Sequence, residues 1–175
     1  MAEPLPYPAD PPISRTDLAP HGAGSLPTLW TRVGARLFDG LILAIPSLIL
    51  ALPHFVFNDG QLELNLPMWA QIATVVGPLL FEIVFLVFWG ATPGKMLLGI
   101  RVVTYVGGQR PALHQVGVRV LLPNLGSVLG LAGVLGGLAG ILSFIGPIMY
   151  FAAALDPLMR GLHDRAAGTI VLRTH

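Results

Sequence analysis

Two long apolar stretches decide the fold of this chain: VGARLFDGLILAIPSLILAL at residues 33–52 and LPMWAQIATVVGPLLFEIVFLVFW at residues 66–89. A helix needs about 20 mainly apolar residues to cross a bilayer core of about 30 Å. Both stretches meet this length, so each is predicted to form a membrane-spanning helix. The composition agrees, because 54% of the 175 residues are hydrophobic and 11% are charged. A soluble domain, by contrast, carries about 25% charged residues.

The loop between these helices, His54 to Asn65, contains two acidic residues, a turn signal at Asn58-Asp59-Gly60 and no Lys or Arg. The positive-inside rule therefore places the loop on the outer side of the membrane. Basic residues precede the first helix and follow the second, so both flanks are expected in the cytoplasm: Arg15, Arg32, Arg36, Lys95, Arg101 and Arg110. The two helices are predicted to form a hairpin that starts and ends on the cytoplasmic side.

A third hydrophobic block covers residues 116–155 and has Arg119 as its single charge. As one helix, its charge-free part would be about 46 Å long, which exceeds what the usual tilt of about 0–40° accommodates. The basic residues that follow the block favour the cytoplasmic side again. We therefore predict two helices, 116–135 and 137–155, that turn at Gly136-Gly137. A three-helix arrangement or a re-entrant hairpin is the alternative.

The predicted architecture is thus all-α, a four-helix transmembrane bundle within residues 29–175. It has a cytoplasmic loop at 90–115 and a cytoplasmic C-terminal segment at 156–175. Residues 1–28 contain seven of the sixteen prolines and no apolar periodicity, which is typical of a disordered tail, here a cytoplasmic one. The strand-like residues 100–106 and 168–173 are predicted to pair as a small cytoplasmic β-hairpin.

Asp39 and Glu82 are ionisable residues at the same depth, about 10 Å from the cytoplasmic edge at a rise of about 1.5 Å per residue. An acid at this depth costs about 2.5–3.5 kcal/mol on insertion scales, so it should face the protein interior and have a partner. Arg32, Arg36 and Asp39 share one helical face, which makes the arginines the expected partners. Two interpretations stay open: an ion pair that fixes helix packing, or a titratable carboxylate that exchanges a proton or cation.

The loop after the second helix is predicted to begin with a short interfacial helix that starts at Thr92-Pro93. It carries Lys95, and a strand with Arg101 follows. Both basic side chains are expected to anchor to anionic lipid headgroups.

Three motifs follow one another along the chain: Arg-x-x-Ala-x-x-x-Asp at residues 32–39, GATPGKMLLGIRVV at residues 90–103 and LHDRAAGT at residues 162–169. Together they resemble the RDD family of bacterial membrane proteins, which is named for one arginine and two aspartates. The resemblance assigns Arg32 to the arginine, Asp39 to the first aspartate and Asp164 to the second, with Asp156 as the alternative. The other motif positions are Gly90, Pro93, Gly94, Lys95, Gly99, Arg101, His163, Arg165 and Gly168.

The resemblance implies an integral protein of the bacterial inner membrane, for which transport of a ligand has been suggested. The long Gly-rich block departs from the usual family pattern. A transporter of a small ligand, or a cation/proton exchanger, would use Asp39 and Glu82 as carriers and Arg32 as the tuning charge. The alternative is a non-transporting scaffold or assembly subunit that binds another membrane protein. The small size and the glycine spacing favour a homo-oligomer or such a partner.

Other function classes are not expected. The chain has no Gly-x-Ser-x-Gly nucleophile motif and no Cys, and its five His residues are scattered, so we predict neither an enzyme nor a metal site or cofactor. A net charge of +1 gives no basic field for nucleic acid. His163 and Asp164 are adjacent and point apart on a helix. Asp164 is instead predicted to contact one of three arginines: Arg32, Arg36 or Arg101.

Overall fold

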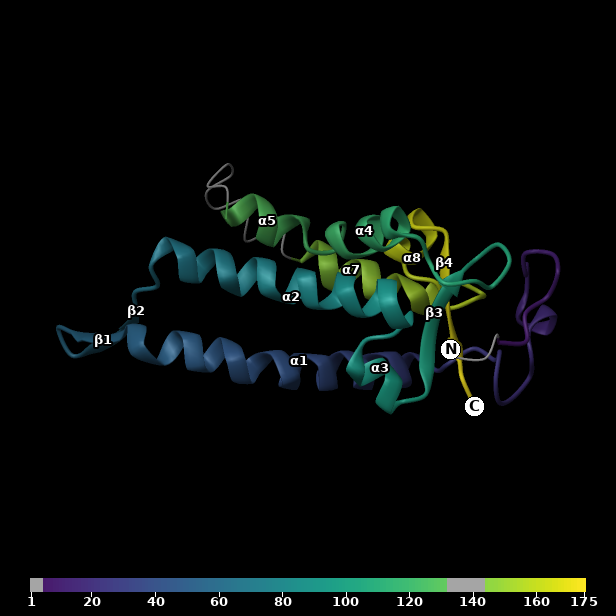
Figure 1. The fold of residues 1–175 in the computed structure, drawn as a ribbon, viewed down its shortest axis with the longest axis horizontal. Coiled ribbons are helices and arrows are strands. Elements are labelled where there is room, and N and C mark those ends of the chain that lie inside the picture. The colour runs from purple at the N-terminus through teal and green to yellow at the C-terminus, as the bar shows by residue number, and fades with distance from the viewer. Residues whose placement is uncertain (1–4, 132–143) are drawn as a thin grey trace.

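Two long antiparallel helices dominate the computed structural model, which describes residues 5–131 and 144–175 (Figure 1). Helix α1 (Leu29–Ala51) continues into the 3-10 turn η2 (Leu52–His54), and α2 covers Met68–Trp89. Within the described residues, Leu29–His54 and Met68–Trp89 are long and apolar enough to cross a membrane. These ranges agree with the two stretches that the sequence analysis predicts.

The surface of both helices is mostly apolar and exposed. On α1, for example, Leu41, Ile45 and Leu48 are exposed and recur at helical spacing along one side. A water-soluble monomer does not present such a continuous apolar face. The exposed face of the helix pair therefore matches a lipid environment.

A small hairpin joins α1 to α2. Strand β1 (Phe55–Asn58) pairs with β2 (Gln61–Leu64) in an antiparallel ladder. The two connecting residues have positive φ, 47° at Asp59 and 77° at Gly60, as the favoured two-residue hairpin turn requires. The turn was predicted from the sequence, whereas the two strands were not.

The second sheet lies at the opposite end of the helix pair, where the described chain ends (Figure 1). Strand β3 (Ile100–Thr104) pairs antiparallel with β4 (Thr169–Arg173), with Val102 opposite Val171. The two predicted segments thus do pair, although they are distant in sequence and do not form a hairpin. Alternate residues face opposite sides, so Ile100, Val102 and Val171 pack against helices, while the other face carries Ile170 and Leu172.

Short helices complete the described fold: α3 (Pro93–Leu97), α4 (Leu113–Leu121), α5 (Leu125–Leu131), α7 (Ile145–Phe151), η3 (Ala152–Leu155) and α8 (Leu162–Ala166). The continuous helix predicted from residue 116 to 135 is interrupted after α4. Pro123 has no amide hydrogen to continue the helix, and the Asn124 side chain donates instead to the Val120 carbonyl at 2.8 Å. The predicted turn at Gly136-Gly137 lies outside the described residues. The structure therefore shows a mostly helical protein, and its described residues do not confirm the predicted four-helix bundle.

The N-terminal segment packs on the outer face of the β3–β4 sheet. Leu18 is buried against this sheet, and the 3-10 turn η1 (Arg15–Asp17) precedes it. Backbone hydrogen bonds join Gly24 to Arg173 and Arg173 to Ser25, at 3.0 and 2.9 Å. Residues from the described part of the tail thus contact the sheet, because single apolar residues can pack on a sheet face without periodicity.

Candidate functional site

The chain reverses sharply after α2, and this turn inserts α3 against α1. Gly90 ends α2 with a φ of 70°, a conformation that favours glycine. Thr92 is the N-cap of α3 and Pro93 its first residue, as is common at helix starts. The predicted helix start at Thr92-Pro93 is therefore confirmed, but α3 is packed inside the protein.

The Asp39 side chain of α1 accepts two hydrogen bonds from the start of α3. The Thr92 hydroxyl donates to Asp39 Oδ2 at 2.5 Å, and the Gly94 amide donates to Asp39 Oδ1 at 2.8 Å. A Cβ at position 94 would lie 2.9 Å from Asp39 Oδ1 and closer still to the carbonyl oxygen of Ala35. Glycine at 94 is thus what allows α3 to approach α1 this closely.

Lys95 lies between two carboxylates from different helices. Its Nζ is 3.9 Å from Asp39 Oδ2, 3.6 Å from Glu82 Oε1 and 3.1 Å from Thr92 Oγ1. The side chain is only 6% exposed. The expectation that Lys95 anchors to lipid headgroups is therefore wrong, because two buried acids offer closer compensation than the membrane surface.

Arg36 completes this group, which we call the Lys95 cluster: Arg36, Asp39, Glu82, Thr92 and Lys95. Arg36 Nη1 donates to Glu82 Oε2 at 2.9 Å. Arg36 Nη2 lies 2.8 Å from Glu82 Oε1 and also donates to the Tyr150 hydroxyl. The guanidinium carbon is also 4.6 Å from the centroid of the Tyr150 ring. The partner of Arg36 is thus Glu82 rather than Asp39, since tertiary contacts take precedence over the shared helical face.

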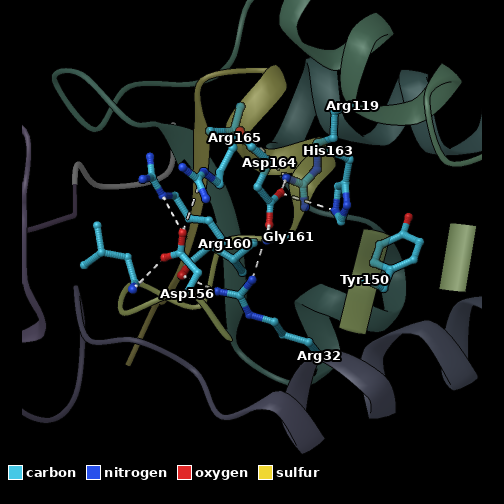
Figure 2. Close-up of polar contacts among 12 residues, drawn as sticks. Arg32, Arg119, Tyr150, Asp156, Arg160, Gly161, His163, Asp164 and Arg165 are labelled. Carbon is cyan, nitrogen blue, oxygen red and sulfur yellow. Dashed lines mark hydrogen bonds and ion pairs between the residues drawn. The ribbon is translucent and has the colours of Figure 1, made fainter. Parts of the chain in front are cut away.

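A second charged group surrounds Asp164 (Figure 2). Asp164 is 3.4 Å from Arg32 and also forms an ion pair with Arg119. The Gly161 amide donates to Asp164 Oδ2 at 3.1 Å, and Nε2 of His163 lies 3.4 Å from Oδ1. We call Arg32, Arg119, His163 and Asp164 the Asp164 cluster. Of the three predicted partners of Asp164, the structure brings Arg32 into contact with it.

Asp156 lies apart from that contact. It accepts from the Leu158 amide at 2.7 Å, and Arg160 and Arg165 each lie 3.9 Å away. Figure 2 shows Asp156 beside these two arginines and Asp164 beside Arg119. Asp164 rather than Asp156 therefore contacts Arg32.

The remaining motif positions support the backbone around these clusters. Gly99 and Gly168 have φ of 60° and 63° and stand directly before β3 and β4, where the chain reverses. Arg101 lies on β3, and its side-chain carbons are close to Gly90. Among the described residues, no group of three His, Asp or Glu side chains is placed to hold a metal ion.

Four side chains of the two clusters or their contacts were not predicted as site residues from the sequence: Thr92, Arg119, Tyr150 and Thr169. Arg119 is buried and donates to the Thr169 hydroxyl at 2.9 Å. It is the single charge of a hydrophobic block, so the depth argument applied to Asp39 would have found it. Thr92 and Thr169 gave no such signal, because a lone hydroxyl is common in any segment.

Burial changes the proton affinity of two groups outside the long helices. The pKa of Lys95 is lowered to about 7, mainly by burial and also by the charges of Arg36 and Arg119, whereas Glu82 and Asp39 oppose the shift. Burial also holds the pKa of His163 well below its usual value, with the charge of Arg119 as the next cause. His163 is therefore neutral at physiological pH.

A cavity of about 500 Å³ leads from the Lys95 cluster along the long helices. Arg36, Asp39 and Glu82 line its charged end, and Thr74 and Ser127 add hydroxyl groups from α2 and α5. Thr74 precedes Glu82 by two turns of α2, so the cavity reaches toward the middle of the helix. Two carboxylates thus line a mostly apolar cavity that has a charged end within the helical part of the protein.

Two apolar helices of spanning length, with a paired group of charges buried between them, define an integral membrane protein. The sequence model of the RDD family matches residues 26–168, a range that contains both clusters. The chain belongs to the RDD family. Comparisons with curated proteins and with solved structures found no match.

The close contact at Gly94 generates a first prediction. Gly94→Ala should lower the free energy of unfolding by about 1–3 kcal/mol, because the added methyl group forces α3 away from α1. Thermal unfolding in detergent, followed by circular dichroism, measures the change. Gly40→Ala is the matched control, since position 40 on α1 has open space around it. Equal unfolding of the two variants would contradict the prediction.

Lys95 is the only lysine of the chain, so selective ¹⁵N-lysine labelling gives one side-chain NMR signal. This signal should titrate at about pH 7 instead of about 10.4. Glu82→Gln should lower the pKa further and Arg36→Gln should raise it, because these charges act in opposite directions. Arg165→Gln, whose side chain is 60% exposed, should leave it unchanged.

The same shift has a consequence for stability. Between about pH 7 and about pH 10.4 the unfolded chain keeps a proton on Lys95 that the folded chain has lost, so the contribution of Lys95 to stability increases with pH through this window. A titration near the ordinary lysine value would show that burial and the neighbouring arginines do not lower the pKa of Lys95 in the membrane protein, which would contradict this prediction.

Proposed function

We propose that this RDD protein exchanges a small monovalent cation for a proton, with the Lys95 cluster as the shared binding site. The observation that carries the proposal is the position of one ammonium group between two carboxylates, both of which line one end of a cavity. An ammonium group in this place has the charge of a monovalent cation and occupies its site.

Charge balance supports a ratio of one cation to one proton. Arg36 and Lys95 carry two positive charges, and Asp39 and Glu82 carry two negative ones, so the cluster is neutral when Lys95 is protonated. Loss of that proton leaves one negative charge in a buried place, which is costly. A monovalent cation that binds Asp39 and Glu82 restores neutrality. The lowered pKa of Lys95, about 7, makes the release of the proton accessible at physiological pH.

We also propose an orientation of the chain in the membrane. The acidic β1–β2 hairpin is placed on the outer side of a bacterial inner membrane, and the β3–β4 sheet and both termini in the cytoplasm, following the positive-inside rule. A homo-oligomer would supply further walls for the pathway. In this arrangement the cavity opens toward the outer half of the bilayer from a charged end near the cytoplasmic face.

Exchange is tested in proteoliposomes that enclose a pH-sensitive dye. Pulses of sodium, potassium or lithium should drive proton movement, and a clamped membrane potential should not alter it because the exchange is electroneutral. Asp39→Asn should abolish the flux. Asp59→Asn, the same change in the exposed β1–β2 turn, is the matched control and should retain it.

The Lys95→Arg variant tests whether exchange requires release of the Lys95 proton or only a positive charge at this position. Arginine keeps the positive charge but does not release its proton, so this variant should fold and show no exchange. If the folded wild-type protein moves no protons with any of the three cations, the exchange proposal fails. The scaffold function then becomes the better explanation of the buried ion pairs.

The orientation is tested with single cysteines, because the chain has none of its own. Gln61→Cys on β2 and Val106→Cys after β3 are both exposed positions. In intact cells, a membrane-impermeant thiol reagent should label the first and not the second, and permeabilisation should expose both. Labelling of both in intact cells would contradict the proposed topology.

A further inference from the structure

A second cavity, of about 290 Å³, lies beside the Asp164 cluster and is largely apolar. Leu29, Val33 and Leu37 line it from α1 at intervals of four residues, and Phe151 lines it from α7. Leu37 and Phe151 are 64% and 62% exposed, so the cavity opens sideways between α1 and α7. In a membrane protein this opening faces lipid.

Positive charge is concentrated on the inner wall of this cavity. Arg32, Arg36, Lys95 and Arg119 line it, whereas Asp164 is its single acidic lining residue among those described. Arg36 and Lys95 are compensated within the Lys95 cluster. Among the described residues, Arg32 and Arg119 form their ion pairs with Asp164 alone, so this group has one more positive charge than negative charges.

The nearest further groups do not remove this excess. Asp156 is the next carboxylate that acts on Arg32, but it lies beside Arg160 and Arg165. Glu82 is the next one that acts on Arg119, but it pairs with Arg36 and Lys95. His163 is neutral and contributes no charge. A buried charge without compensation is costly, which makes the excess an argument for a bound anion.

Unpartnered donors mark where such an anion would bind. The Nε atoms of Arg32 and Arg119 are buried and have no hydrogen-bond partner among the described residues. The Arg119 side chain is only 3% exposed, and Figure 2 shows Arg32 and Arg119 on either side of Asp164. Buried donors are rarely left unpaired in proteins.

We infer that this cavity binds one anionic phospholipid, with the phosphodiester at Arg32 and Arg119 and part of an acyl chain against Leu29, Val33 and Leu37. A phosphodiester carries one negative charge, which equals the excess. Arginine also matches phosphate geometry with paired N–H groups. Basic pockets between membrane helices are known to hold lipid headgroups in this way.

A lipid fits this place better than a free anion. The mouth is apolar and faces the bilayer, so a small ion from water would have to pass apolar side chains to reach the arginines. Trp30, next to Leu29, is 80% exposed, and tryptophan at such positions typically marks the headgroup level of a bilayer. The arginines therefore lie at the depth of lipid phosphates.

Native mass spectrometry of the full chain measures this binding, with phosphatidylglycerol and phosphatidylcholine of equal acyl chains as probes. One phosphatidylglycerol should bind about tenfold more tightly than phosphatidylcholine, which corresponds to about 1.4 kcal/mol. Arg119→Gln should remove this preference. Arg165→Gln, on the same helix as Asp164 but outside the cavity lining, should retain it.

A second pair of variants keeps the test valid if Arg119→Gln does not fold. Leu37→Trp places a bulky side chain in the mouth and should weaken phosphatidylglycerol binding about tenfold. Leu41→Trp lies one turn further along α1, is also 64% exposed in the native chain, and should have no effect.

Three results would overturn the inference. The first is equal binding of the two lipids, and the second is equal binding of phosphatidylglycerol by the Leu37→Trp and Leu41→Trp variants. The third is displacement of phosphatidylglycerol by an equal concentration of glycerol phosphate, which lacks acyl chains. That outcome would identify a site for a free anion instead of a lipid.

Discussion

The compensation of one buried ammonium group organises this structure. A desolvated charge without partners costs several kcal/mol, and Lys95 finds its partners only where α1 and α2 are held together, since Asp39 and Glu82 belong to different helices. The contact therefore fixes three elements at once: the spacing of the helix pair, the depth of α3 and, through Gly99, the start of β3. The sheet and the helices are joined at the point where the charges meet.

Much of this arrangement could be predicted from the sequence by hydropathy and depth. The ranges of the two long helices, the pairing of residues near 100 and 170, and the importance of Asp39, Glu82 and Asp164 follow from patterns within short segments. The identity of the partners does not. Lys95 looked like a surface residue because it follows a helix end, and only its placement under α1 explains why glycine stands at position 94.

The remaining differences also come from contacts between distant segments. Because Arg36 and Asp39 share one face of α1, the sequence predicts that they form an ion pair. In the structure, Arg36 pairs instead with Glu82 of α2. The Pro-rich N-terminus has no periodic pattern, yet Leu18 packs against a sheet whose second strand is at the other end of the chain. Such contacts depend on how the elements meet, which neither composition nor spacing contains.

The two charged clusters differ in balance, and this difference suits them to different ligands. The Lys95 cluster has equal numbers of positive and negative charges, so one monovalent cation can replace a proton there without leaving a buried net charge. The Asp164 cluster has two arginines for one carboxylate, so it gains from an anion that stays bound. A lipid phosphate at the second cluster would also keep the positive charge of Arg32 and Arg119 from repelling a cation at the first, because it cancels the excess close to its source.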